Sequence, residues 1–289
     1  DDRRVCVWHV ANALAAAPGG ERSDEPAEKA CAASWYAHTA RVWACCWGAD
    51  RTDSGDGRQV LTAGEDGRVR VWRVGARPDG VAPTARGALG AGVCNARVDG
   101  AEMLAELAGH AGKHVWCVAV DPAGRHVVSG GADGSVKVWP APAAPHDRAA
   151  APPWDELRGP SGAENIRAVH VVGEDCVLAA TESGRVWCLP SSKGGALLLH
   201  AEDGVRCSAL LAHTPSGPSA DTLLLIGSAN GHARLLRVQR ALLRPGGGGG
   251  GAVVEVVAAW RAHTNCVLVL AWASPPPDGE GADGGGGGR

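Results

Sequence analysis

The chain has 289 residues, and its 28 Lys and Arg against 31 Asp and Glu give a formal net charge of −3. This near balance excludes a basic nucleic-acid-binding tail or an acidic solvating tail as the main feature of the chain. No apolar run approaches the roughly 20 residues that a membrane-spanning helix needs. Gly and Pro, with 42 and 18 residues, lie just under the level that is typical of low-complexity sequence.

The N-terminal segment, residues 1–10, predicts the end of a repeated unit. In DDRRVCVW, Asp2 occupies a turn position and Trp8 ends a short strand with alternating apolar residues. Because the sequence starts inside such a unit, we expect it to be a piece of a longer protein.

Two segments, residues 35–74 and 107–140, repeat one pattern closely. Each contains a histidine, an apolar strand, a second strand with Thr or Ser near its end, an Asp-Gly turn, and a third strand that ends in Trp. Asp-Gly between alternating apolar runs predicts a hairpin whose two central residues both take positive φ. The pattern therefore predicts repeated antiparallel β-sheet.

Three further segments fit the pattern less well: residues 158–190, 198–238 and 260–272. The first two have Leu189 and Leu236 where the closer copies have Trp, and the third contains the beginning of a copy.

Polar or Ala/Pro/Gly-rich inserts separate these units. We expect them chiefly at residues 11–34, 74–105, 140–160, 213–221 and 240–253. Residues 273–289 are expected to form a disordered Gly/Pro tail.

These residues resemble WD repeats, the units of β-propellers. In that family a His, a Ser or Thr, the turn Asp and the Trp form a hydrogen-bonded chain inside one blade, where four buried polar groups satisfy one another. The resemblance implies two such structural tetrads: His38, Thr62, Asp66 and Trp72, then His110, Ser129, Asp133 and Trp139. It implies an all-β, WD40-type β-propeller, of which this chain holds about four recognisable blades plus two half repeats, with long loop insertions.

Enzyme signatures are absent from the sequence. It contains no phosphate-binding loop, no H-E-x-x-H zinc motif and no G-x-S-x-G elbow. The ten cysteines include no C-x-x-C pair, and most lie in apolar runs, which favours buried reduced thiols in a cytoplasmic protein. We therefore expect no catalytic residue, no bound metal and no cofactor.

One surface stands out when the first strands of the repeats are aligned. An equivalent position in five successive units holds, in order, Trp43, Trp116, Arg167, Arg206 and Leu268. Arg41 and Lys113 lie just before it, each three residues after a predicted blade-opening histidine. Because equivalent strand starts meet at one rim of the central channel of a propeller, we expect a rim that stacks on a partner's side chains or on RNA bases.

The succession of motifs is more specific than WD repeats in general. It runs from DDRRVCVW through YAHTARVWACCW, LTAGEDGRVRVW, GHAGKHVWCVAVDP and SGGADGSVKVW to ENIRAV and ESGRVWCL. Over roughly residues 1–240 it resembles the family of WD repeat-containing protein six, which regulates the tRNA wobble-position ribose 2′-O-methyltransferase.

That resemblance implies a non-catalytic subunit that binds the methyltransferase catalytic subunit, with tRNA reached through the complex. It implies no membrane and no small-molecule substrate. Two alternatives stay open from the sequence. One is a generic protein–protein scaffold, such as a ubiquitin-ligase receptor or a trafficking protein, and the other is a purely structural propeller segment.

Overall fold

The computed structural model describes residues 3–8, 31–48, 58–74, 97–98, 101–111, 114–142, 155–158, 164–172, 176–190, 196–200, 207–213, 221–239, 254–267 and 270. Every regular element in these ranges is a β-strand, and every pairing between strands is antiparallel. The all-β fold class expected from the repeats is confirmed.

The strands form five sheets in chain order. The first sheet consists of β1 (Arg4–Trp8) and β2 (Cys31–Tyr36). The second has the order β3-β4-β5-β7-β6, with β3 (Val42–Trp47), β4 (Arg58–Gly64), β5 (Arg68–Val74), β6 (Arg97–Val98) and β7 (Ala101–Ala108). The third is built from β8 (Val115–Val120), β9 (His126–Gly131), β10 (Ser135–Pro140) and β11 (Asp155–Arg158).

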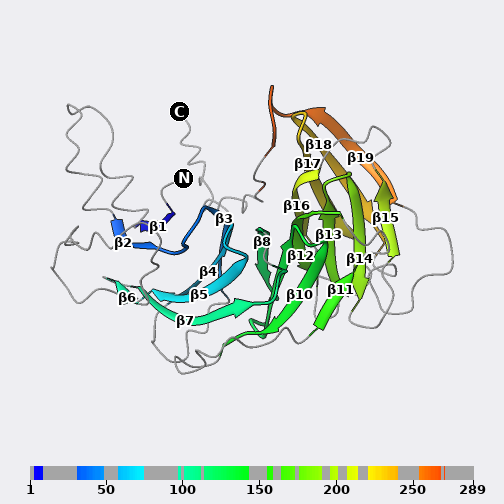
Figure 1. Cartoon of the computed structure of the whole chain (residues 1–289). Coiled ribbons are helices and arrows are strands. Elements are labelled where there is room, and N and C mark those ends of the chain that lie inside the picture. Colours follow the sequence, from blue (N-terminus) through cyan, green and yellow to red (C-terminus); the bar gives the residue numbers. More distant parts are fainter. Residues whose placement is uncertain are drawn as a thin grey trace, which may run out of the picture.

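The last two sheets follow the same meander. The fourth contains β12 (Ile166–Val172), β13 (Cys176–Thr181), β14 (Arg185–Pro190) and β15 (Ala196–His200). The fifth contains β16 (Cys207–His213), β17 (Thr222–Ser228), β18 (His232–Val238) and β19 (Val254–Arg261). Figure 1 shows the five sheets following one another along an arc, from β1 to β19.

The first strands of the sheets lie beside one another on the inner side of the arc. β3 contacts β8, β8 contacts β12, and β12 contacts β16. The chain then runs outward through each sheet and returns to the inner side to begin the next. This places the starts of β3, β8 and β12 close together, and the rim residues lie at these starts.

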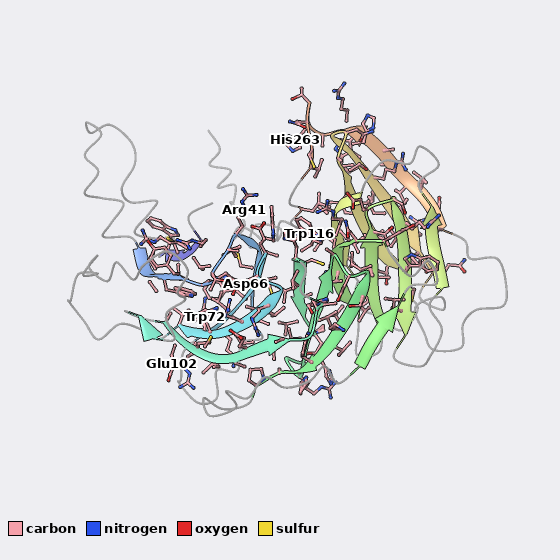
Figure 2. The ribbon with its side chains drawn as sticks, in the orientation of Figure 1. Arg41, Asp66, Trp72, Glu102, Trp116 and His263 are labelled. Carbon is pink, nitrogen blue, oxygen red and sulfur yellow. The ribbon has the colours of Figure 1, made fainter. Side chains whose placement is uncertain are left out.

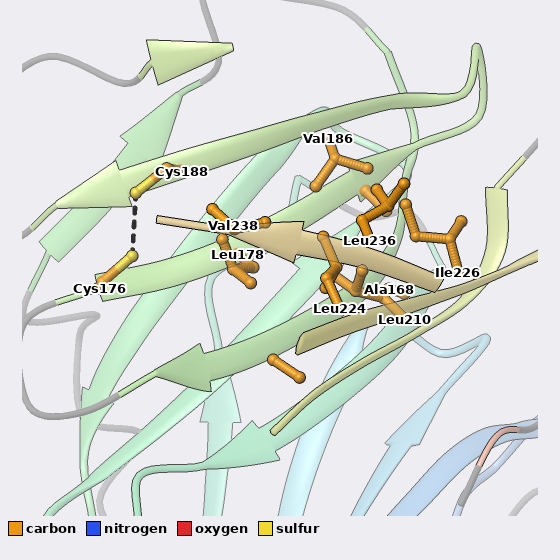
Figure 3. Packing of buried hydrophobic residues seen from close by; sticks show 12 residues of the cluster. Ala168, Cys176, Leu178, Val186, Cys188, Leu210, Leu224, Ile226, Leu236 and Val238 are labelled. Atoms are coloured by element: carbon orange, nitrogen blue, oxygen red, sulfur yellow. Dashed lines mark hydrogen bonds between the residues drawn. The ribbon is translucent and has the colours of Figure 1, made fainter. Parts of the chain in front are cut away.

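Each pair of neighbouring sheets encloses one hydrophobic cluster. Four such clusters fill the four interfaces. The cluster between the fourth and fifth sheets is drawn in Figure 3, where Leu178, Leu224 and Leu236 pack between the two layers. Alternation along the strands supplies one apolar face to each interface, so the sheets stack like blades around an axis.

The sheets are offset from the sequence repeats by one strand. The unit predicted as residues 35–74 begins inside β2, which belongs to the preceding sheet, and ends before β7, which pairs with β5. In the same way β11, β15 and β19 complete the third, fourth and fifth sheets from segments beyond their third strands. Each repeat therefore contributes strands to two sheets, which ties neighbouring blades together.

The structure corrects one expectation about the turns. Among the described residues, only glycines and Arg3 have positive φ, so Asp66 and Asp133 do not. The amide of Gly67 donates to the carbonyl of Gly64 at 3.3 Å, so residues 64–67 form a β-turn. Gly67 is the last residue of this turn and has φ of 75°. A turn followed by one left-handed residue needs a glycine only at that last position, so the prediction of two residues with positive φ was wrong.

Arg3 aligns with these turn glycines and has φ of 65°. Its carbonyl accepts a hydrogen bond from the amide of Ala37 at 3.0 Å. This hydrogen bond connects the start of the first sheet to the loop that leads into the second sheet. The positive φ of Arg3 is strained, because Arg3 carries a side chain.

Candidate functional site

A chain of side-chain hydrogen bonds crosses the second sheet. Nε1 of Trp72 lies 3.0 Å from Oγ1 of Thr62, and Thr62 Oγ1 lies 2.8 Å from Nε2 of His38. Nδ1 of His38 lies 2.8 Å from Oδ1 of Asp66. Trp72, Thr62 and His38 are almost completely buried. The structure thus brings together the four residues of the first tetrad, and Figure 2 labels Asp66 and Trp72 within the sheet.

The third sheet contains the second tetrad in the same geometry. Trp139 Nε1 lies 2.9 Å from Ser129 Oγ, and Ser129 Oγ lies 2.8 Å from His110 Nε2. His110 Nδ1 lies 3.0 Å from Asp133 Oδ1. The hydroxyl of Ser135 also donates to this carboxylate oxygen, at 2.8 Å.

One direction of donation satisfies all of these groups. The indole N–H donates to the hydroxyl oxygen, the hydroxyl donates to Nε2 of the histidine, and Nδ1–H of the same histidine donates to the carboxylate. A histidine with its proton on Nδ1 fits this order in the second tetrad, whereas in the first the Nη1 donor of Arg70 also lies 2.7 Å from Nδ1 of His38. Each histidine therefore has a structural role, because both of its ring nitrogens are occupied inside the sheet.

The carboxylates at the ends of these two hydrogen-bond series have lowered pKa values. Burial by itself would raise the pKa of Asp66, but the hydrogen bond to His38, together with the hydrogen bond and charge of Arg70, lowers it below the usual range. The pKa of Asp133 is lowered in the same way, because His110 and Ser135 outweigh the effect of burial. Both side chains are consequently held as anions.

These shifts predict a loss of stability in acid. A carboxylate whose folded pKa lies below its unfolded value of about 4 stabilises the fold above that pH, and its contribution disappears as the pH falls toward the folded pKa. We expect the gap in unfolding free energy between the native chain and Asp133→Asn to be constant above pH 6 and to narrow from pH 5 to pH 3. Urea denaturation at each pH measures it, and a gap that does not change with pH would refute the assignment.

Two glycines that sequence reasoning missed make room for the histidines. A Cβ on Gly64 would lie 2.2 Å from Nδ1 of His38, and one on Gly131 would lie 2.4 Å from Nδ1 of His110. Both glycines precede the turn Asp by two positions. This shared spacing in the two repeats is the sequence feature from which their role could have been predicted.

A second group missed by sequence reasoning is the ion network around Arg70, which is buried in β5. Its guanidinium donates to Asp66 at 2.7 Å and to the Ala37 carbonyl at 3.2 Å. It also pairs with Glu106 of β7 at 2.8 Å. The network joins β5, β7 and the turn between β4 and β5 to the loop before β3.

The fourth sheet replaces the tetrad with a different network. Ser183, at the turn Asp position, donates to Glu164 at 2.6 Å and lies 3.1 Å from Thr181 Oγ1. Arg185 also pairs with Glu164. Glu164 comes from the loop before β12, and the corresponding loops of the second and third sheets contain His38 and His110. A carboxylate therefore connects that loop to the turn in the fourth sheet.

The rim residues that the structure describes come together on the inner side of the arc. The rings of Trp43 and Trp116 have centroids 4.7 Å apart, and the guanidinium of Arg167 lies 4.0 Å from the centre of the Trp116 ring. Arg41 lies 5.9 Å from the Trp43 ring. Figure 2 labels Arg41 and Trp116 on this side of the sheets. We call Arg41, Trp43, Trp116 and Arg167 the rim stack. Lys113, Arg206 and Leu268 lie outside the described residues.

Two carboxylates and a histidine, none of them foreseen, flank the rim stack. Glu182 accepts a hydrogen bond from Arg167 at 3.1 Å, and Glu65 lies 3.9 Å from Arg41 and 3.8 Å from His114. The His114 ring packs against Trp116 with centroids 5.1 Å apart. Glu65 and Glu182 each follow the last residue of the second strand of their sheets, and His114 directly precedes β8.

The described residues also bear on metal binding and on membrane-spanning helices. Among these residues, no group of three His, Cys, Asp or Glu side chains is placed to bind a metal ion. The described part of the chain also contains no helix long and apolar enough to cross a membrane. Cys176 and Cys188, whose Sγ atoms lie 3.0 Å apart in the fourth sheet, are buried thiols that form no disulfide (Figure 3).

Antiparallel sheets whose first strands β3, β8, β12 and β16 lie side by side, with a polar tetrad inside two of them, are typical of the blades of a β-propeller. Residues 29–73 and 101–140 match the WD40 family, described as "WD domain, G-beta repeat", and these ranges contain both tetrads. These two segments are therefore similar to WD40 repeats, and their strands are arranged as propeller blades.

A solved structure with a similar arrangement is the beta-propeller domain of Cps50 (Swd1) from Myceliophteria thermophila. It shares 15% sequence identity with this chain at a TM-score of 0.49. The alignment covers 78% of this chain and 58% of that one, so this chain spans less than two thirds of the compared structure. No curated protein matches the sequence.

Proposed function

We propose that this chain is a non-catalytic WD-repeat scaffold subunit that binds and regulates a tRNA 2′-O-ribose methyltransferase acting on the wobble nucleotide of the anticodon. Two lines of reasoning support the proposal. The succession of motifs over residues 1–240 resembles a family with this role, and the scaffold architecture offers a surface for a partner. In this proposal the partner supplies the catalytic residues and S-adenosylmethionine, and tRNA reaches the scaffold through the complex.

The observation that carries the binding surface is the exposed rim stack. Trp43 is 39% exposed although it is a large apolar side chain at the start of an inner strand. Tryptophan and arginine dominate the binding energy of protein interfaces when they cluster at one point. The rim stack supplies both residue types from three successive sheets, and a partner that covers it would remove this apolar surface from water.

We also place the complex in the cytoplasm. Seven of the cysteines within the described residues are not joined in a disulfide, which suits a reducing compartment where thiols persist.

A matched pair of tryptophans tests the proposal. Trp47, at the far end of β3, is 53% exposed and has Arg58 lying 6.0 Å from its ring, so it resembles Trp43 and Arg41 in exposure and chemistry. We expect Trp43→Ala to lower recovery of the methyltransferase with the tagged full chain at least tenfold, which corresponds to about 1.4 kcal/mol or more. Trp47→Ala should leave the recovery unchanged.

The readout is the amount of methyltransferase and tRNA that elutes with each variant at equal scaffold loading. Equal recovery with Trp43→Ala and Trp47→Ala would remove the rim stack from the interface. Recovery of ubiquitin-ligase or vesicle-coat subunits in place of the methyltransferase would replace the proposed function with the generic scaffold function.

A further inference from the structure

The rim stack is a series of planar groups that ends at an exposed ring. β12 contributes Arg167, β8 contributes Trp116 and β3 contributes Trp43, and each group packs on the next. Trp116 is covered by Arg167 and Trp43, whereas Trp43 is 39% exposed and has Arg41 5.9 Å from its ring centre. A further planar group can therefore extend the stack at Trp43 when it displaces Arg41.

The same stack shows how a guanidinium is held at this rim. Arg167 lies 4.0 Å from the Trp116 ring centre and at the same time donates to Glu182 at 3.1 Å. An indole face and a carboxylate thus hold one guanidinium between them. Arginine suits such a site because its planar group can stack and donate in a fork at once.

Glu65 repeats the position of Glu182 in the second sheet, but its carboxylate is less occupied. Its contacts to Arg41 and His114, at 3.9 and 3.8 Å, exceed hydrogen-bond length. Its side chain is 30% exposed. In the part of the chain that the structure describes, Trp43 and Glu65 therefore form an indole and carboxylate pair that holds no guanidinium closely.

We infer that Trp43 and Glu65 bind an arginine side chain of the protein partner. The partner's guanidinium stacks on the open face of Trp43 and donates to the carboxylate of Glu65, as Arg167 does with Trp116 and Glu182. Arg41, whose side chain is 51% exposed, competes weakly for the same carboxylate and is displaced. This inference deepens the proposed function, on which it rests for the nature of the partner as a protein.

The charges at the rim favour arginine over a phosphate backbone. Arg41 and Arg167 carry two positive charges, and Glu65 and Glu182 carry two negative charges, so the four described side chains sum to zero. Nucleic-acid affinity arises largely from basic groups that release counterions from phosphates. Arg41 and Arg167 already face carboxylates, so they would contribute little to the affinity for a phosphate backbone. The carboxylate of Glu65, in contrast, attracts a cation.

The sign of the effect at Arg41 separates the two ligand classes. If the rim binds an arginine, Arg41→Glu removes the competitor, adds negative charge and strengthens binding. If the rim binds phosphate, the same change weakens binding.

The probes are the peptide acetyl-Gly-Gly-Arg-Gly-Gly-amide, its citrulline counterpart, and oligouridylate. Each is titrated into the full chain while the indole N–H resonances are followed by NMR.

We expect the arginine peptide to bind at least fivefold more tightly than the citrulline peptide. Glu65→Gln should weaken arginine-peptide binding about tenfold, because a charge-assisted hydrogen bond becomes a neutral one. Arg58→Gln, at the start of β4 beside Trp47, should leave the affinity unchanged, and melting curves establish that each variant is folded. Equal affinity for the two peptides, no effect of Glu65→Gln, or tighter binding of oligouridylate that Arg41→Glu abolishes would each overturn the inference.

These outcomes are separate from those of the co-purification experiment. A chain that prefers the arginine peptide but recovers no methyltransferase would support the arginine site and refute the proposed partner. A chain that recovers the methyltransferase equally well with native Glu65 and with Glu65→Gln would retain the proposed function and lose the arginine site.

Discussion

Replacing Trp139 with alanine is expected to lower the free energy of unfolding by about 3–5 kcal/mol, the range for removing a fully buried tryptophan. The side chain is completely buried in the cluster between the second and third sheets, so the change opens a cavity between two blades. It also removes the N–H that donates to Ser129. Chemical denaturation of the full chain measures the loss.

Two controls separate packing from hydrogen bonding at this site. Trp139→Phe keeps most of the ring and should cost only about 1–2 kcal/mol, mainly for the lost hydrogen bond. Trp260→Ala, at a side chain that is 45% exposed, should change stability by no more than about 0.5 kcal/mol. Equal losses at Trp139 and Trp260 would contradict the buried position of Trp139.

Adding one methyl group at Gly131 should cost on the order of 3 kcal/mol, although the change is small. A Cβ there would lie 2.4 Å from Nδ1 of His110, so the ring must move and its hydrogen bonds to Asp133 and Ser129 are lost. Overpacking and unsatisfied buried groups each cost about 1–3 kcal/mol.

A double-mutant cycle identifies the cause of that loss. In a His110→Ala background the ring is absent, so Gly131→Ala should cost less than half of its value in the native chain. The same cost in both backgrounds would show that backbone strain, and not collision with His110, explains the effect.

The two tetrads were predicted from the sequence because their pattern is local and regular. A histidine, a hydroxyl, an Asp-Gly turn and a tryptophan recur in order in both segments. Alternating apolar residues between these markers predicted antiparallel strands, and hydrophobic residues at every second position need a sheet face to cover them. The fold class followed from these features.

Other parts of the site depend on residues that meet only after folding. His114 and Glu65 lie in different sheets, and no spacing in the sequence predicts that they flank Trp43. Glu164 takes the place of a histidine in the fourth sheet with a network of its own, because any side chain that satisfies the buried hydroxyls can occupy that loop.

The sequence by itself determined that this protein is built from repeated antiparallel units with internal polar tetrads, because local alternation and turn chemistry specify them. It also determined which strand positions are equivalent. Only the tertiary structure decided that each repeat is shared between two sheets, and that Trp43, Trp116 and Arg167 stack at one rim. The physical reason is that stacking and ion pairing depend on the rotation between neighbouring blades, and this rotation is set by how the hydrophobic clusters pack between the sheets.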